Sequence, residues 1–160
     1  MAFDFKKEYK EFYMPKNKPQ IVNVPKANYI AVRGKGNPNE EGGAYQQAIS
    51  VLYAVAYTVK MSYKTDFEWA VATATKKKKL DCSSAEFLTI EEGLCVQIMH
   101  AGPFDDEPAI VAMMDTFLEQ NGYANDFSES RLHHEIYLSD ARKVAPDKWK
   151  TVIRHPIKKV

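Results

Sequence analysis

The 160-residue chain has no strong charge of either sign. Its net charge of +1 comes from 22 basic and 21 acidic side chains, without the basic excess that nucleic-acid-binding proteins usually carry. The dense basic cluster Lys76 to Lys79 is more typical of the solvated end of a helix. The composition therefore argues against a nucleic-acid partner.

Long apolar runs are also missing. No segment approaches the roughly 20 consecutive apolar residues that cross a bilayer, and the first ten residues are charged, unlike a signal peptide. We therefore expect a cytoplasmic protein with no membrane partner. Cysteine is scarce, and Cys82 and Cys95 form neither a C-x-x-C pair nor part of a ligand cluster. The sequence predicts reduced thiols, with Cys95 inside an apolar strand.

The most informative feature that is present is the alternating run from His133 to Ser139. Its period of two predicts a strand with Glu135 and Tyr137 on one face and Ile136 and Leu138 on the other. A carboxylate on a strand usually points to solvent; the alternative is a cavity that requires a charge. This run alone leaves both directions open for Glu135.

The same order of signals occurs twice along the chain. Extended segments at Ile21–Val24 and Tyr29–Arg33 flank Pro25 and precede a glycine break and a helix from Ala44 to about Met61. In the second half, the strand Gly93–Met99 precedes a glycine break, an acidic loop and a helix that ends at Asn121-Gly122, with strands around Glu135 and at Thr151–His155. The pattern indicates a duplicated strand-helix-strand-strand module.

The first copy of this module looks incomplete. Only Ser62 to Asp66 separate its long helix from the next helical pattern, Phe67 to about Lys79, and five residues are too few for two strands and their turns. We expect a single domain over residues 1–160 in which a segment is missing between 66 and 67, either deleted naturally or omitted from this sequence. Omission is favoured, because loss of two core strands would expose sheet edges.

Several runs resemble the stand-alone GyrI-like small-molecule-binding proteins of bacteria, and the match extends over nearly the whole chain. These runs are Tyr13–Pro19, Tyr45–Ile49, Gly93–Pro108, His133–Asp140 and Thr151–Ile157. The resemblance implies an α+β fold of two strand-helix-strand-strand repeats, with antiparallel sheets, helices packed on one side and a ligand groove between the repeats. The effector-binding domains of multidrug-sensing transcription activators and the SOUL haem-binding proteins share this fold.

The resemblance also implies a role for Glu135, because the family's matching acid faces the ligand cavity. Family members usually carry an aromatic-rich hairpin between the first long helix and the next, and this sequence lacks it. An acid in an apolar groove selects lipophilic cations or acts as a general acid or base. The expected catalytic residues are Glu135 as the acid/base and Tyr137 as its hydrogen-bond partner.

The expected ligand-binding residues are mostly aromatic, since rings attract cations by roughly 0.5–2 kcal/mol per good contact. They are Tyr53, Tyr57, Trp69, Phe104 and His100. Each has a plainer alternative: Tyr53 and Tyr57 lie one helical turn apart and would ordinarily face the core, and Phe104 would pack onto the second helix. Adjacent His133 and His134 point to opposite strand faces, so we expect no metal, and we expect no cofactor.

Two functions remain open from the sequence. The resemblance suggests binding, and hydrolysis, of lipophilic or cationic compounds such as cyclopropane-bearing DNA-alkylating toxins, as part of detoxification. The alternative is a non-enzymatic protein that sequesters ligands or interacts with a partner such as DNA gyrase. Haem binding rests on fold analogy alone, and we do not expect a transcription regulator, because these residues include no helix-turn-helix pattern ahead of the domain. The sequence carries no signal of a particular oligomeric state.

Overall fold

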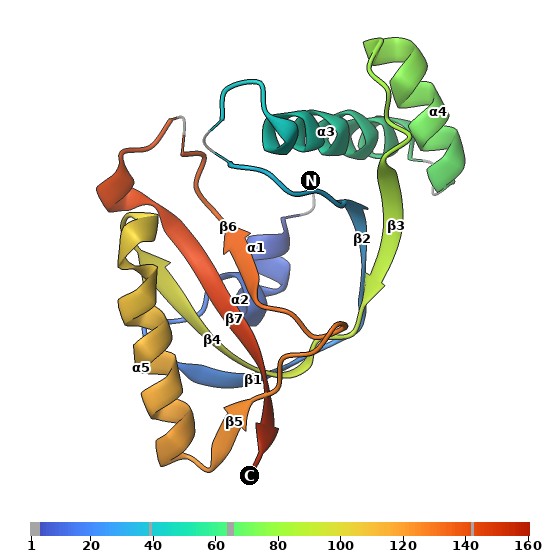
Figure 1. Cartoon of the computed structure of the whole chain (residues 1–160). Helices are drawn as coiled ribbons and strands as arrows, with labels where there is room; N and C mark the ends of the chain where they lie inside the picture. Colours follow the sequence, from blue (N-terminus) through green and yellow to red (C-terminus); the bar gives the residue numbers. More distant parts are fainter. Residues whose placement is uncertain (1–3, 39, 64–65, 142) are drawn as a thin grey trace. The chain divides into compact units, whose positions relative to one another are not determined.

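The computed structural model describes residues 4–38, 40–63, 66–141 and 143–160, and its internal contacts divide the chain into two compact units (Figure 1). Unit 1 comprises Met1–Lys26 and Glu91–Val160, and unit 2 comprises Ala27–Ile90. Unit 2 is therefore an insertion between two strands of unit 1. Each unit has its own sheet and its own hydrophobic core.

Unit 1 is built on an antiparallel five-stranded sheet in which β4 and β7 are central. The strand order is β1-β4-β7-β5, and β6 also pairs with β7. The strands are β1 (Gln20–Val24), β4 (Gly93–Ala101), β5 (Tyr123–Asn125), β6 (His134–Tyr137) and β7 (Lys150–Lys159). The helical segments are α1 (Phe5–Glu8), α2 (Lys10–Tyr13), η1 (Phe104–Asp106), α5 (Glu107–Gln120) and η2 (Pro146–Lys148).

The core of unit 1 lies between α5 and one face of this sheet. Met114 and Leu118 of α5 pack on alternate residues of β4 and β7, namely Val96, Ile98, Ile153 and Ile157. The turn into α5 requires Gly102, whose φ of 138° few other residues adopt. Pro108 then lies in the first turn of α5, where its missing N–H costs no helical hydrogen bond.

Unit 2 pairs β2 (Ala27–Val32) with β3 (Ala85–Ile90) and packs α3 (Ala44–Ser62) and α4 (Phe67–Lys78) beside them. Its buried residues are small: Val51, Ala54, Val55, Ala70, Ala74 and Cys82. The Asp66 carboxylate caps α4 by accepting a 2.9 Å hydrogen bond from the Trp69 amide. The lysine cluster occupies the last turn of α4, as predicted.

The predicted α+β fold of antiparallel sheets and helices is confirmed, with instructive differences. Pro25 separates two strands of different units, whereas the sequence pattern assigned both to the first repeat. Strands β3 and β5 were not predicted; β5 has only three residues, too few to show a period. Met113 of α5 is exposed, although the helical spacing of apolar residues in the sequence predicts it on the inner face beside Met114. Both cysteines are buried free thiols, and Cys95 lies in β4 as expected.

The segment expected to be missing between residues 66 and 67 stays a prediction, and the neighbouring Lys64 and Thr65 lie outside the described residues. In the described residues of unit 2, β2 is followed by α3, by α4 and then by β3. The order of these elements is therefore strand-helix-helix-strand. Among the helices in the described ranges, none has the length and apolar character needed to cross a membrane.

Candidate ligand-binding site

The strand register of unit 1 places three of the predicted site residues on the sheet face that α5 covers. Glu135 of β6 lies opposite Ile153 of β7, which packs against α5. Tyr137 lies opposite Thr151, and His100 of β4 pairs with Thr151 from the other side. Directly opposed residues share a face, so His100, Glu135 and Tyr137 share this one.

Glu135 is half-buried, and both of its carboxylate oxygens have hydrogen-bond partners. The Tyr137 hydroxyl donates to Oε2, and Nε2 of His133 lies 2.9 Å from Oε1. On its other side, Nδ1 of His133 lies 2.8 Å from Nε2 of His155. The predicted contact between Glu135 and Tyr137 is therefore present, and two histidines extend it into a chain of four side chains.

Aromatic rings continue this arrangement on both sides of the acid. The Phe104 ring centroid lies 5.4 Å from that of Tyr137 and 4.6 Å from that of Trp149. At the other end, the Phe127 ring lies 5.0 Å from the His155 ring. Phe104 is partly exposed and contacts these rings beside the acid. Such rings offer flat faces for stacking and for cation–π attraction.

A second carboxylate, Glu107, begins α5 close to this group. Burial, followed by the negative charge of Glu135, raises the pKa of Glu107, against the opposing effects of His100 and His133. Its Oε1 atom is buried without a hydrogen-bond partner among the described residues. Glu107 is therefore the carboxyl group of this face that is better suited to hold a proton.

His100 shares this face but is almost fully buried. Its Nε2 lies 2.9 Å from the Pro103 carbonyl oxygen, which only accepts, so Nε2 carries the proton. His100 thereby fixes the turn that leads to Phe104. Its predicted contact with ligand stays a prediction.

The other predicted aromatic residues belong to unit 2. Tyr53 and Tyr57 are 68% and 55% exposed on α3, so they do not form the core stripe that their spacing would ordinarily indicate. Lys78 Nζ lies 5.8 Å from the Tyr57 ring centroid, so this ring already faces a cation. Trp69 packs against the core of unit 2. A role for these three residues in ligand binding stays a prediction.

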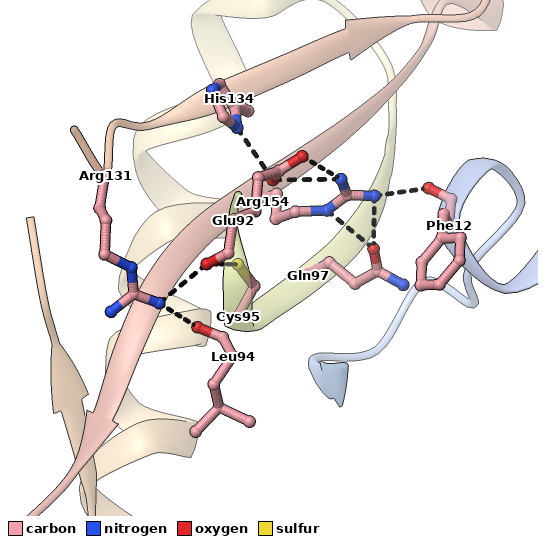
Figure 2. Close-up of polar contacts among 8 residues, drawn as sticks. All are labelled: Phe12, Glu92, Leu94, Cys95, Gln97, Arg131, His134 and Arg154. Carbon is pink, nitrogen blue, oxygen red and sulfur yellow. Dashed lines mark hydrogen bonds and ion pairs between the residues drawn. The ribbon is translucent and has the colours of Figure 1, made fainter. Parts of the chain in front are cut away.

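The opposite face of the unit 1 sheet carries a buried ionic network, shown in Figure 2. Gln97, Arg154 and His134 lie in one row across β4, β7 and β6. Arg154 donates to Glu92 at 3.0 and 3.2 Å, to Oε1 of Gln97 at 3.0 and 3.1 Å, and to the Phe12 carbonyl at 2.8 Å. His134 Nδ1 lies 2.9 Å from Oε2 of Glu92, an oxygen that Arg154 also contacts.

The partners of Glu92 affect its pKa more strongly than its burial does. Burial alone would raise its pKa, but the hydrogen bond from His134 and the charge of Arg154 outweigh it, and the pKa of Glu92 is lowered. The nearby Cys95 thiol behaves oppositely: burial and then the charge of Glu92 raise its pKa to about 11. Cys95 is therefore not a nucleophile at neutral pH. The buried polar side chains of this network, Glu92, Gln97 and Arg154, are hydrogen-bonded within the described protein. The Glu135 face differs, because Oε1 of Glu107 and Nδ1 of His155 are buried there without a partner among the described residues.

In the described part of the chain, no three His, Cys, Asp or Glu side chains are arranged to hold a metal ion. His133 and His134 do point to opposite faces, since one contacts Glu135 and the other Glu92.

Comparison with known proteins identifies the family of this chain. The model of the GyrI-like small molecule binding domain matches residues 50–158. The chain belongs to the GyrI-like family. The crystal structure of a hydrolase from Listeria innocua shares 40% identity with this GyrI-like chain, with a TM-score of 0.90 over 98% of this chain and 100% of the other. An uncharacterized conserved protein from the same organism shares 39% identity, with a TM-score of 0.90 and the same coverage.

A comparison with curated protein sequences gave no match. The family match makes this GyrI-like chain a small-molecule-binding protein.

Sequence reasoning missed four residues that this GyrI-like face assembles: Glu107, Phe127, Trp149 and His155. Two of them had a detectable signal. His155 lies two residues after Ile153 along a predicted strand, so the two side chains share a face, and Ile153 places that face toward the core. Glu107 lies directly before Pro108, a residue typical of the first turn of a helix, and an acid there also fits the favourable charge of a helix start. The contacts of Trp149 and Phe127 depend on how loops return to the sheet, which no local pattern reports.

Proposed function

We propose that this GyrI-like protein binds lipophilic cations at Glu135 and hydrolyses electrophilic ring compounds there, with cyclopropane-bearing DNA-alkylating compounds as the substrate class. The supporting observation is a half-buried carboxylate with a row of aromatic rings beside it. Apolar rings around one charge suit a ligand that is both flat and cationic.

The binding step depends on the charge of Glu135. Among the described residues, Glu135 accepts its hydrogen bonds from the His133 imidazole and the Tyr137 phenol, and neither donor is a permanently charged group such as a guanidinium. A cationic ligand supplies the missing countercharge, while Phe104, Tyr137 and Trp149 supply stacking surface.

Hydrolysis would use the same groups. Glu135, as general base, accepts a proton from water; the water oxygen bonds to a cyclopropane carbon as the ring C–C bond breaks. The electron pair of that bond passes into the conjugated carbonyl, whose oxygen takes a proton. Glu107, with its raised pKa, is the proposed proton donor. One water is added, and the two carboxyl groups then exchange protons with solvent.

The relation to the Listeria innocua hydrolase supports this proposal, since that protein is 40% identical over its full length. Sequestration without turnover is the competing form of the same function and is distinguished below.

Binding is tested with tetraphenylphosphonium, a lipophilic cation that does not titrate. We expect Glu135→Gln to weaken its affinity about ten-fold or more, because the substitution removes the charge and keeps the shape. Glu129→Gln, an exposed acid in the loop before β6, is the matched control and should bind as the wild type does. Equal affinity of the Glu135→Gln variant and the wild type would refute the binding proposal.

Turnover requires a separate experiment. The protein is incubated with a cyclopropane-bearing alkylator, and mass spectrometry follows the product formed by addition of one water. We expect many turnovers for the wild type and none above background for Glu135→Gln. Unchanged compound bound at a one-to-one ratio would instead establish sequestration. A protein complex that survives the Glu135 substitution would favour a role in protein interaction.

A further inference from the structure

We propose that His155 is a positioning residue that keeps His133 electrically neutral, and thereby keeps the charge of Glu135 available to a cationic ligand. This inference rests on the proposed binding function. It concerns two histidines, one of which, His155, does not contact the carboxylate.

The hydrogen-bond chain restricts where its protons lie. Glu135, when ionised, only accepts, so Nε2 of His133 must donate to its Oε1. A neutral His133 then presents a bare Nδ1, and Nε2 of His155 must donate to it across 2.8 Å. With both imidazoles neutral, every polar hydrogen in the chain has an acceptor, and Nδ1 of His155 carries no proton.

Protonation of His133 would break this arrangement. An imidazolium donates through both nitrogens, so Nε2 of His155 would have to become the acceptor. The proton of His155 would then move to Nδ1, a buried atom that has no partner among the described residues. A buried N–H without an acceptor is unfavourable. His155 therefore opposes formation of the imidazolium at His133.

The environment of His155 supports this role. Its side chain is 4% exposed, with the Phe127 ring against it. Burial, and then the nearby His133, lower the pKa of His155 to about 4, despite Asp115. His155 is consequently neutral throughout the neutral range and acts only through its hydrogen bond.

The consequence for ligand binding is a competition between two cations. If His133 became an imidazolium, it would pair with Glu135 and cancel the charge that the ligand needs. Other titratable groups lie near the hydrogen-bonded residues Glu135, His133 and His155 as well. They are Glu107 and Asp115 from α5, His100 from β4 and Tyr137 from β6. Their effects are held constant by comparing variants at His133 and His155 alone.

The test follows the affinity for tetraphenylphosphonium from about pH 5.5 to 8.5, the range in which an ordinary histidine titrates. In His155→Leu, we expect the affinity to fall about three- to ten-fold near pH 6 and less than two-fold near pH 8.5. The pH at which half of the affinity change has occurred, called the midpoint below, should therefore move upward by about half to one unit. His155→Gln, whose amide nitrogen can replace the Nε2 donor, should restore the wild-type profile.

A second substitution shows whether His155 acts through His133. Glutamine at position 133 keeps a donor toward Glu135 but never becomes charged. In the His133→Gln background, His155→Leu should therefore no longer move the midpoint. His134→Gln is the matched control on the opposite face, where His134 contacts Glu92, and it should leave the midpoint unchanged.

The outcomes separate this proposal from the one on which it rests. Equal weakening at every pH in His155→Leu would indicate a merely structural role and overturn the inference, whereas wild-type binding by Glu135→Gln overturns the binding function itself.

Nitrogen-15 NMR of the wild-type histidines needs no variant. Neutral His133 and His155 with protons on Nε2 are expected at pH 7, and an imidazolium at His133 would overturn the inference.

Discussion

His133, just before β6, and His134, its first residue, contact opposite faces of the same sheet. His133 contacts Glu135 on the face covered by α5, while His134 contacts Glu92 on the other. The two carboxylates differ in what surrounds them: Glu92 pairs with Arg154, whereas the described hydrogen bonds of Glu135 come from an imidazole and a phenol. Removing one member of the Glu92–Arg154 pair would leave a buried charge uncompensated, whereas a carboxylate without a basic partner such as arginine can pair with a cationic ligand.

The paired acid yields a prediction about stability. Glu92→Gln leaves the buried Arg154 guanidinium without its countercharge, so we expect the free energy of unfolding to fall by about 3–5 kcal/mol. Urea denaturation followed by circular dichroism measures this change. Glu91→Gln, at the exposed neighbouring position, is the control and should differ from wild type by less than about 0.5 kcal/mol. Equal stability of the two variants would contradict this account of the network.

At the scale of the elements, local signals determine where helices end. Asp66 caps the start of α4, and three lysines occupy its last turn, where positive charge is favourable. The residue after α4, Lys79, has a left-handed backbone with φ of 51°. Glycine is the residue ordinarily found there.

This helix end gives opposite predictions for two neighbouring lysines. Lys79→Gly relieves the left-handed conformation and should raise the free energy of unfolding by about 1 kcal/mol. Lys77→Gly, inside the helix, should lower it by about 1 kcal/mol, because glycine is a poor helix former. Thermal and urea unfolding of both variants decide the matter, and a loss of stability in Lys79→Gly would show that the lysine side chain outweighs its backbone strain.

At the scale of the whole molecule, the chain divides its apolar residues between two cores of unequal quality. Unit 1 buries Ile98, Met114, Leu118, Ile153 and Ile157, whereas unit 2 buries mainly alanine and valine. Smaller side chains remove less apolar surface from water, by roughly 25 cal/mol per Å². Unit 2 is expected to be the less stable part.

The two free cysteines report on this difference, since Cys82 lies in the core of unit 2 and Cys95 lies in unit 1. In increasing urea, brief treatment with iodoacetamide followed by mass spectrometry should label Cys82 at a lower urea concentration than Cys95. Identical midpoints for both thiols would show that the units unfold together.

Much of the fold was predictable because its signals are local. The helices α3, α4 and α5 follow from apolar spacing and flanking residues, and β4 and β7 follow from apolar runs. The strands β3 and β5 escaped, and the division of β1 and β2 between two units could not be read from residues around Pro25. Strand pairing joins residues far apart in sequence, and short strands carry little pattern of their own.

The sequence by itself determined that Glu135 and Tyr137 share a face, because alternation along a strand is a property of the backbone. It also determined the family, through runs that need no coordinates to recognise. Only the tertiary structure decided which residues surround the acid. His155 reaches His133, and Phe104 and Trp149 line up beside Tyr137, through the register of β6 on β7 and through loops. The pairing of Glu92 with Arg154 spans 62 positions. Contacts of that range depend on the folded sheet and on no local preference.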